Sequence, residues 1–382
     1  MIRKTFQRDD CQMRILNIVS SNIVQDPRIL KQMETIKQVT DDYIVLGKMN
    51  AEVTDERLAK LDFHYKLIGS KVNDTTLLKK IVHRIQFGRQ VIRYIRNYRP
   101  AVIHANDFDV LLITYLSRYK GARIIYDAHE IYSKNAFINK IKILSHFVQR
   151  LEKHIIKHID HFITVSHAAK GYYQAEHYPK IPVVITNAPI KQLNEKQTWK
   201  KDTFEVVYQG QIVSDRGYEE FMEAGTMLAD EEIELVIRGF GPLKQKLQDK
   251  QSEMGIRNVR FAPPVEMDEL VSKLRESSVG VILTKGISIN FEYTVSNKIF
   301  ECIHAGLPVI LSPVKEHIYL NDTYQFGIVL EEVTPQKIAT AITTLKNDTR
   351  LYAELEKNAT AAAQQLTWQV EEQKLIALYT KS

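Results

Sequence analysis

Short apolar runs and amphipathic stretches alternate along most of this chain, and this alternation constrains its fold more than any other feature. In the first half the apolar runs lie at residues 13–19, 43–47, 63–68, 101–105, 122–126, 161–165 and 182–186, and helical patterns fill several of the intervals between them. Strands that alternate with helices form parallel sheets, which helices cover on both faces. The sequence therefore predicts a doubly wound α/β architecture.

The alternation is interrupted once, by the polar segment 187–201, and it resumes at Phe204. A chain of 382 residues is too long for one ordinary hydrophobic core, so we expect two domains. Ligands of such sheets bind at the carboxyl ends of the strands, and we expect the two domains to face each other across a cleft there. The predicted parts are a first Rossmann-like domain at 1–188, a linker at 189–201, a second Rossmann-like domain at 202–365, and a C-terminal helix at 366–382 that packs back toward the first domain.

Charge and cysteine content bear on partners and compartment. Residues 1–190 carry 30 Lys and Arg against 18 Asp and Glu, a net charge of +12, whereas residues 191–382 carry 22 against 28, a net charge of −6. This asymmetry indicates that the first domain meets an anionic partner, either nucleic acid or an acidic membrane surface. Cys11 and Cys302 make neither a disulfide framework nor a metal set, no apolar run is long enough to span a bilayer, and the N-terminus lacks the apolar core of a signal peptide. We therefore expect a cytoplasmic protein.

The stretch 291–308 has the most specific local pattern in the chain. Ser296 and Asn297 are typical N-cap residues, and Gly306 is a typical helix stop. The pattern predicts a loop and then a helix over 296–305.

The predicted helix start suits an anion. Free N–H groups and the helix dipole make a helix N-terminus positive, and Lys298 adds a charge, so a phosphate group would bind there. Glu301, one turn further on, suits a sugar hydroxyl such as those of a ribose. An ordinary amphipathic surface helix is the alternative interpretation.

Two further loops of the second half have the residues of an anion site. In the first, Gly210 lets a ligand approach a strand end and Arg216 brings a cation to a helix start. In the second, Gly239 and Gly241 lie at a strand-to-helix turn, where tight turns also need glycine. Because three loops converge on one edge of the predicted sheet, we expect a phosphate site there.

Several motifs together resemble glycosyltransferase family 4, whose fold is GT-B. In the second half these are Asp-Arg-Gly at 215–217, Arg-Gly-Phe-Gly-Pro at 238–242 and Ser-Asn-Lys-Ile-Phe-Glu with Gly-Leu-Pro at 296–308. In the first half they are Asp-Pro-Arg-Ile-Leu at 26–30, Ile-His-Ala-Asn-Asp at 103–107 and Tyr-Asp-Ala-His-Glu at 126–130. The resemblance spans nearly the whole chain and implies a nucleotide-sugar donor bound by the second domain.

The resemblance also implies roles for single residues. Arg216 and Lys298 face the donor diphosphate, and Glu301 holds the ribose hydroxyls. The turn that ends at Val265 borders the base, and His129 approaches the transferred sugar; a hydrogen-bonded core histidine is the alternative for His129. The implied catalytic residues are His129, Arg216 and Lys298; the donor-binding residues are Gly210, Gln211, Arg216, Gly239, Gly241, Val265, Glu292, Ser296, Asn297, Lys298 and Glu301; and the acceptor-side residues are Asp26, Arg28, Asp107 and Glu130.

Two positions depart from the family pattern. Tyr293 stands where the family often has a Glu, with Glu292 beside it, and Gln211 stands where the family usually has a phosphate-binding Arg. Arg216 and Lys298 are then left to supply the positive charge. Whether Glu292 contacts the donor sugar stays open at this point.

The expected chemistry needs fixed positive charge more than it needs acids. Transfer from a nucleoside diphosphate leaves negative charge on the β-phosphate, which cations and N–H groups stabilise. No pair of carboxylates suggests a hydrolase. The resemblance implies retention of the anomeric configuration, with the departing phosphate accepting the acceptor's proton and His129 orienting the sugar. Asp107-Phe-Asp109 is a literal Asp-x-Asp metal motif, but it lies at a helix start, where Asp is a common cap, so we expect no metal and no cofactor.

Two segments of the first half are basic and amphipathic. The predicted helix at 77–97 contains Lys79, Lys80, Arg84, Arg89, Arg93 and Arg96 and no acid, and residues 134–157 contain Lys140, Lys142, Arg150 and Lys153. Such helices can lie on anionic lipid, although ordinary surface helices are the alternative. Nucleic acid is not expected, because no platform of aromatic and basic residues is present.

These observations predict a metal-independent, retaining glycosyltransferase at the inner face of a bacterial membrane, where it extends a glycan in surface polysaccharide biosynthesis. Its expected partners are a nucleotide-sugar, a glycan or lipid-linked acceptor and the anionic membrane surface. Two alternatives remain. One is a nucleotide-sugar epimerase of the same fold, which would need acid and base groups around the sugar, and the other is a non-catalytic nucleotide-sugar-binding protein.

Overall fold

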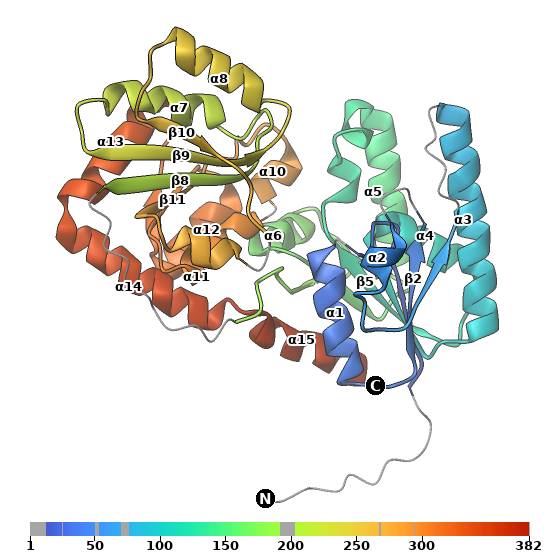
Figure 1. Cartoon of the computed structure of the whole chain (residues 1–382). Helices are drawn as coiled ribbons and strands as arrows, with labels where there is room; N and C mark the ends of the chain where they lie inside the picture. The colour runs from blue at the N-terminus through green and yellow to red at the C-terminus, as the bar shows by residue number, and fades with distance from the viewer. Residues whose placement is uncertain are drawn as a thin grey trace, which may run out of the picture. The chain divides into compact units, whose positions relative to one another are not determined.

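The computed structural model describes residues 13–24, 26–49, 53–69, 76–191, 203–266, 269–293 and 295–381. These residues form two compact units, whose elements are labelled in Figure 1. Unit 1 comprises the described residues up to Val165, Tyr173–Ile185 and those from Glu372 onward, and unit 2 comprises Ser166–Tyr172 and the described part of Thr186–Glu371. Most of the predicted linker, residues 192–201, lies outside the described residues.

In its described residues, unit 1 contains a parallel sheet with the strand order β3-β2-β1-β4-β5-β6-β7. The strands β1 and β4 are buried along their whole length, as expected in a sheet covered on both faces. The elements are β1 (Ile15–Ile18), α1 (Pro27–Lys37), β2 (Tyr43–Lys48), α2 (Asp55–Leu58), β3 (Tyr65–Ile68), α3 (Leu77–Tyr98), β4 (Val102–Asn106), α4 (Asp107–Leu116), β5 (Arg123–Ala128), the 3₁₀ turns η1 (Tyr132–Lys134) and η2 (Ile138–Lys140), α5 (Lys142–Ile156), β6 (His161–Thr164) and β7 (Val183–Val184).

Unit 2 likewise contains a parallel sheet, with the strand order β10-β9-β8-β11-β12-β13 in its described part. The helices α6 (His167–Ala175) and α15 (Trp368–Thr380) each contain residues of both units. The other elements are β8 (Phe204–Gln211), α7 (Tyr218–Met227), β9 (Ile233–Phe240), α8 (Lys244–Glu253), β10 (Val259–Ala262), α9 (Leu270–Leu274), β11 (Val279–Ile282), α10 (Ile289–Tyr293), α11 (Asn297–His304), β12 (Val309–Leu311), α12 (Lys315–Tyr324), β13 (Gly327–Val329), α13 (Pro335–Asn347) and α14 (Thr349–Gln365).

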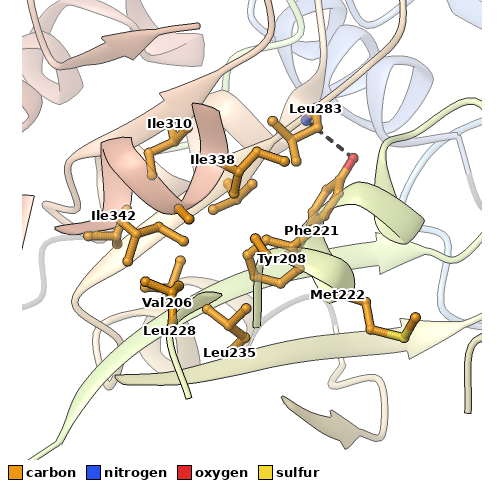
Figure 2. Packing of buried hydrophobic residues seen from close by; sticks show 14 of the residues in the cluster. Val206, Tyr208, Phe221, Met222, Leu228, Leu235, Leu283, Ile310, Ile338 and Ile342 are labelled. Carbon is orange, nitrogen blue, oxygen red and sulfur yellow. Dashed lines mark hydrogen bonds between the residues drawn. The ribbon is translucent and has the colours of Figure 1, made fainter. Parts of the chain in front are cut away.

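Alternate residues of β8 pack on opposite faces of the unit 2 sheet. Val206 and Tyr208 lie on the face covered by α7 and α13, where Phe221 is fully buried (Figure 2). The Tyr208 hydroxyl accepts a hydrogen bond from the Leu283 N–H at 3.3 Å. Val207, between them, packs on the other face with residues of α9, α11, α12 and α14. Both faces of this sheet are therefore covered, as the sequence predicts.

Each sheet has one switch point, where strands stop being added on one side and start being added on the other. It lies between β1 and β4 in unit 1 and between β8 and β11 in unit 2. The loops that follow the two strands of a switch point turn to opposite faces and leave a crevice at the carboxyl ends, where doubly wound sheets bind ligands. Each unit therefore has one place at which a ligand site is expected.

The structure confirms the α/β class and most predicted elements, and it corrects some boundaries. The strands β8 and β9 continue through Gly210 and Gly239 (φ 129° and 148°), which pair in register within the sheet. The predicted loop before α11 contains the short helix α10. No helix among the described residues is both long and apolar enough to cross a bilayer.

Candidate functional site

A pocket of about 590 Å³ opens at the carboxyl ends of the unit 2 strands, at the switch point between β8 and β11. Arg216, Lys298 and Glu301, on which the predicted phosphate site depends, all lie on its wall. The complete lining is Gln209, Gly210, Gln211, Arg216, Arg238, Gly239, Phe240, Pro264, Val265, Leu270, Thr284, Phe291, Val295, Ser296, Asn297, Lys298, Glu301 and His317.

The N-terminus of α11 lies at this pocket. Ser296 is its N-cap residue and has the extended backbone of a cap (φ −85°, ψ 125°), whereas Gly306 follows its end with φ 77°, as predicted. The apolar side of the helix, which includes Phe300, is buried in the core. The free N–H groups of the first turn are therefore available to an anion at the pocket wall.

Lys298 lies across the end of β8. A Cβ built on Gly210 would be 2.2 Å from the Lys298 Cε, so a glycine at this position makes room for the lysine side chain. The Lys298 ammonium lies 5.9 Å from the centroid of the Tyr208 ring. Burial, together with the nearby charge of Arg216, lowers the pKa of Lys298 to about 8. A bound anion would relieve both effects.

Arg216 is held in place by an aromatic ring and a hydroxyl. Its guanidinium carbon lies 4.3 Å from the centroid of the Phe291 ring, and its Nη1 donates to the Thr284 hydroxyl at 3.0 Å. The Tyr208 hydroxyl donates to the Arg216 carbonyl and fixes the loop that carries it. The cation is therefore oriented before any ligand binds.

Glu301 faces the pocket one turn after Lys298. The Gln209 amide donates to Glu301 Oε2 at 3.0 Å. Burial raises the pKa of Glu301, and the Gln209 hydrogen bond and the Lys298 charge act against that rise. The carboxylate is thus positioned to accept hydrogen bonds from ligand hydroxyls beside the two cations.

Most other predicted donor residues also lie on the pocket wall, whereas two do not. Gln211, Gly239, Val265, Ser296 and Asn297 are all among the lining residues.

Gly241 and Glu292 are the predicted donor residues that the structure does not bring to the wall. A Cβ on Gly241 (φ 156°) would lie 2.1 Å from the Ile212 carbonyl, so this glycine serves the close approach of two backbone segments. Glu292 instead points at Gly286, where a Cβ would lie 2.3 Å from its Oε2.

Four polar residues of the pocket were not among the predicted site residues: Gln209, Arg238, Thr284 and His317. Arg238 had a signal in the sequence, because a lone arginine in the apolar run of a doubly covered strand needs a partner. His317 had none, since α12 is not apparent from the pattern. Burial lowers the pKa of His317 to about 4, which makes it neutral near pH 7.

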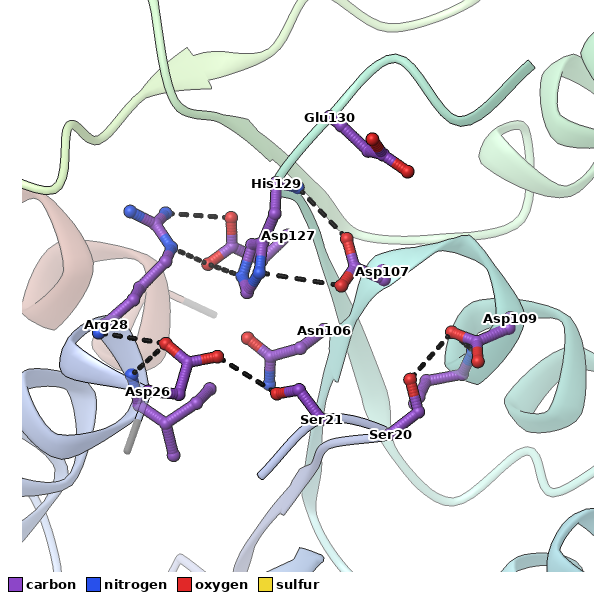
Figure 3. A network of polar contacts seen from close by, with 12 residues as sticks. Ser20, Ser21, Asp26, Arg28, Asn106, Asp107, Asp109, Asp127, His129 and Glu130 are labelled. Atoms are coloured by element: carbon purple, nitrogen blue, oxygen red, sulfur yellow. Dashed lines mark hydrogen bonds and ion pairs between the residues drawn. The ribbon is translucent and has the colours of Figure 1, made fainter. Parts of the chain in front are cut away.

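A second polar cluster lies at the switch point of unit 1 (Figure 3). Arg28 of α1 donates from Nε and Nη2 to the two carboxylate oxygens of Asp127, each at 2.8 Å, and from Nη1 to the Ile185 carbonyl at 2.9 Å. Burial opposes ionisation of Asp127, but Arg28 and His129 hold its pKa well below the usual range. The Arg28 side chain is 4% exposed with all three groups engaged, so this geometry favours a structural role over acceptor contact.

His129 connects this ion pair to Asp107. Its Nδ1 lies 3.5 Å from Asp107 Oδ2, and its Nε2 lies 3.6 Å from Asp127 Oδ2. Burial acts to lower the pKa of His129, but these two carboxylates raise it to about 9. Burial raises the pKa of Asp107 to about 6. Near pH 7 the His129 ring is therefore protonated, and a protonated imidazole cannot act as a general base.

Asp26 and Glu130 are engaged with the protein itself. Asp26 is the N-cap of α1, where Oδ1 accepts from the Arg28 N–H at 3.1 Å and Oδ2 from the Ser21 hydroxyl at 2.9 Å (Figure 3). The Glu130 carboxylate accepts from the Asn135 amide at 2.6 Å. Their predicted acceptor-side roles stay predictions.

The two acids of the Asp-x-Asp sequence have different partners. Asp107 faces His129, whereas Asp109 accepts from the Ser20 hydroxyl at 3.2 Å (Figure 3). Asp107 also has φ 67°, a backbone conformation that is costly for a non-glycine residue and concentrates at functional sites. In the described part of the chain, no three His, Cys, Asp or Glu side chains are grouped as metal ligands would be.

Two family models match adjacent parts of the sequence. Residues 189–362 match the model described as glycosyl transferases group 1, and residues 53–188 match the model described as glycosyltransferase family 4. No curated protein sequence matches the chain significantly.

Solved structures of the same fold cover nearly the whole chain. Sucrose-phosphate synthase from Thermosynechococcus elongatus has a TM-score of 0.77 at 16% identity, covering 96% of this chain and 98% of its own. HepE from Anabaena in complex with UDP has a TM-score of 0.74 at 15% identity, with 95% and 98% covered. A mutant of S. aureus TarM, in complex with Fondaparinux, alpha-GlcNAc-glycerol and UDP, has a TM-score of 0.72 at 11% identity, with 97% and 100% covered. These similarities show the GT-B fold.

Proposed function

Because this chain belongs to glycosyltransferase family 4 and has the GT-B fold, we propose that it transfers a sugar from a nucleoside-diphosphate sugar to a glycan acceptor. The observation that carries the proposal is the convergence of Arg216, Lys298 and Glu301 on one pocket of unit 2. The UDP named in the complexes of HepE and TarM supports a nucleoside diphosphate as the donor handle.

In this proposal the pocket binds the donor through its charge. The α11 N-terminus, Arg216 and Lys298 bind the diphosphate, and Glu301 binds the ribose hydroxyls. As the sugar leaves, negative charge grows on the β-phosphate, where the oriented guanidinium and ammonium stabilise it by several kcal/mol. These two cations supply the positive charge without a metal ion.

For the transfer itself we propose retention of the anomeric configuration, with the departing phosphate accepting the proton of the acceptor hydroxyl. The unit 1 cluster supports this assignment, because Asp107 and Asp127 keep the His129 ring protonated. A protonated ring cannot accept the proton of the acceptor hydroxyl, which leaves that role to the phosphate. His129 then donates a hydrogen bond that orients a sugar hydroxyl.

A thermal-shift panel of UDP, GDP, ADP and their sugars tests donor binding. A ligand at 100 times its Kd stabilises the native protein by about 2.7 kcal/mol, which for a unit of this size raises Tm by roughly 5–10 °C. The expected result is a clear rise with at least one nucleotide. Arg216→Ala and Glu301→Ala should each weaken its Kd about ten-fold or more, because each removes a charged hydrogen-bonding group.

Lys246→Ala is the matched control for these variants. Lys246 forms an exposed ion pair with Glu219 on the same unit and does not line the pocket, so its loss should leave the nucleotide Kd unchanged. The donor assignment would be wrong if no nucleotide raised the Tm of the wild type, or if both pocket variants bound the nucleotide with the wild-type Kd.

Two alternative functions share this pocket and differ in products. An epimerase would return the nucleotide still joined to a sugar of altered configuration, and a binding protein would return its ligand unchanged. Incubation of the bound nucleotide-sugar without acceptor, followed by NMR, distinguishes them, because a transferase slowly releases free nucleoside diphosphate and sugar to water. The anomeric configuration of the sugar in the first transfer product then tests retention.

We further propose that the acceptor is lipid-linked and that unit 1 meets an anionic membrane, as expected for surface polysaccharide biosynthesis. Apolar side chains are exposed on α3, on α5 and in the segment before α5. The exposed surface formed by Ile81, Val82, Ile85, Phe137, Ile141, Ile143 and Phe147, with Lys79, Lys80, Arg84, Lys140 and Lys142, is called the basic apolar patch below.

The two parts of the basic apolar patch are coupled electrostatically. Burial raises the pKa of Tyr132 in η1 to about 12, and the charge of Arg84 on α3 acts against this rise. The turns η1 and η2 pack against α5. Exposed apolar side chains with basic neighbours fit the interface of an anionic bilayer, where the apolar groups insert and the cations meet phosphate groups.

A further inference from the structure

Arg238 is a buried cation on the pocket wall whose hydrogen bonds are incomplete. It lies in β9, is 3% exposed and lines the pocket. Its Nη1 has no hydrogen-bond partner among the described residues. A buried guanidinium is costly unless its donors are paired, so a ligand in the pocket is the natural source of an acceptor.

The acid nearest to Arg238 does not complete its pairing. Glu205 lies 4.0 Å from Arg238 Nη2 and accepts no hydrogen bond from Nη1. The Glu205 carboxylate accepts from the Ser277 hydroxyl at 2.6 Å and from Arg260 at 3.1 Å. Burial lowers the pKa of Arg238, which is consistent with a cation only weakly compensated by the protein.

The strand order places Arg238 away from the two cations that would bind the diphosphate. Thr284, which accepts a hydrogen bond from Arg216, follows β11, and Gly210, against which the Lys298 side chain lies, is on the neighbouring strand β8. Next across the sheet, Arg238 is on β9 and Val265 follows β10. Neighbouring strands lie about 4.8 Å apart, so these positions span three spacings, about 14 Å. Glu301, bonded to Gln209 on β8, lies between the two ends.

This order matches the order of groups in a nucleoside diphosphate. With the diphosphate over β11 and β8 and the ribose at Glu301, the base lies over β9 and β10. Val265 and Leu270 supply apolar contacts for the faces of a ring there, and Arg238 is the buried cation in that part of the wall.

We propose that Arg238 Nη1 donates a hydrogen bond to a carbonyl oxygen of the donor nucleobase and thereby selects uracil or guanine over adenine. A guanidinium can only donate, and where guanine and uracil present a carbonyl oxygen adenine presents an amino group, which is itself a donor. A site built around a buried donor rejects a base that leaves this donor unpaired. The inference rests on the proposed function, because it assigns the base specificity of that donor site.

The test measures Kd for UDP, GDP, ADP and ribose 5-diphosphate by calorimetry on the full chain. The wild type should bind UDP or GDP about ten-fold or more tighter than ADP, since one charged hydrogen bond is at stake. Arg238→Met, which keeps the length of the side chain and loses the donors, should weaken that preferred ligand about ten-fold and leave ADP and ribose 5-diphosphate unchanged. The base preference therefore disappears in the variant.

Two further variants separate recognition from stability. Arg260→Met removes the neighbouring arginine that pairs with Glu205 and Glu234 outside the pocket, and it should change none of the four Kd values. Arg238→Lys keeps a donor and is expected to retain part of the preference even if Arg238→Met does not fold.

The outcomes distinguish this proposal from the donor assignment beneath it. If UDP, GDP and ADP bind the wild type equally, or if Arg238→Met weakens all four ligands equally, Arg238 has only a structural role and the proposal is overturned while the donor assignment stands. If none of the four ligands binds the wild type, the donor assignment fails and the base preference fails with it.

Discussion

At the scale of single residues, the pKa of Lys298 gives the pocket a characteristic dependence on pH. The side chain is a cation below a pKa of about 8 and neutral above it, so the affinity for a diphosphate should be constant near pH 7 and fall as pH rises through 8. This affinity falls about ten-fold per pH unit when binding requires one proton. The bound anion raises the pKa of Lys298, so the decrease in affinity begins at a higher pH. Calorimetric Kd values for the best-binding nucleoside diphosphate between pH 7.0 and 9.5 measure this profile.

Lys298→Arg is the variant that isolates this lysine. Arginine stays charged throughout this range, so the variant should bind with an affinity that does not change with pH. Lys246→Arg, an exposed lysine of α8, should keep the wild-type profile. An unchanging wild-type affinity up to pH 9.5 would show that the Lys298 ammonium does not contact the diphosphate.

Residue types in the sequence indicated most of the residues that line the unit 2 pocket, but some lining residues were not predicted. Lys298 and Glu301 were predictable, because a helix start with N-cap residues fixes which side chains share one face. The family resemblance suggested Glu292 and left its contact open, and the structure places this residue on a short helix, where it points at Gly286. Arg238 stands out in the sequence as a lone arginine in an apolar run, but the direction of its side chain, like that of His317, depends on tertiary packing, which local pattern does not encode.

At the scale of elements, the paired strands β8 and β9 position the pocket through their glycines. Gly239 opposes Gly210 in register, and a Cβ at 239 would lie 1.9 Å from the Gly210 carbonyl. Gly239→Ala must therefore push the strands apart and also adopt φ 148°, with a combined cost of about 3 kcal/mol. This lowers the Tm of unit 2 by roughly 6–12 °C in calorimetry, and the nucleotide Kd weakens as the pocket wall shifts.

Gly171→Ala is the matched control for Gly239→Ala. A Cβ at 171 meets nothing within 4 Å, and alanine favours the helix α6, so Tm should stay level or rise slightly. Surface substitutions typically change Tm by no more than about 2 °C. If the Tm of Gly239→Ala stays within this range of wild type, then the two strands separate there at little cost.

The same glycines explain why element boundaries were less predictable than element types. Glycine in a sequence usually weakens or ends a strand, and Gly210 and Gly239 were expected at a strand end and a strand-to-helix turn. The strands β8 and β9 instead continue past them because the two glycines face each other, which is visible only once the strands are paired. The long helix α3, by contrast, was predicted to within a residue, since its apolar period is sustained over six turns.

At the scale of the whole molecule, the alternation of strands and helices was sufficient to predict two doubly wound units. The order of strands was not contained in the pattern, because it depends on how crossovers pack.

The charge asymmetry has a structural counterpart in α3. Its C-terminal half is buried at Val91 and Ile95, whereas Ile81 and Ile85 in its N-terminal half are 47% and 52% exposed. The apolar face of this helix is therefore covered along only part of its length.

The uncovered half of α3 leads to a prediction about membrane binding. Full-length protein should sediment with vesicles of phosphatidylcholine and phosphatidylglycerol, less with phosphatidylcholine alone, and less as salt rises, because screening shortens the reach of its charges. Each basic residue contributes about 1 kcal/mol near an anionic surface, so replacing Lys79, Lys80 and Arg84 by Gln should weaken binding roughly a hundred-fold. Replacing Ile143 and Phe147, which are 85% and 63% exposed, by Ser should weaken binding to both kinds of vesicle.

Replacing Lys244, Lys246 and Lys250 of α8 by Gln removes the same number of charges from unit 2 and serves as the matched control. If this control triple weakens sedimentation as much as the α3 triple, then the attraction follows from net charge and the basic apolar patch has no special part in it. If instead only the α3 triple and the Ile143/Phe147 double release the protein, charge and apolar insertion act together at one surface. That combination is what separates an interfacial enzyme from a basic protein that adheres to any polyanion, because adhesion to a polyanion needs no exposed isoleucine or phenylalanine.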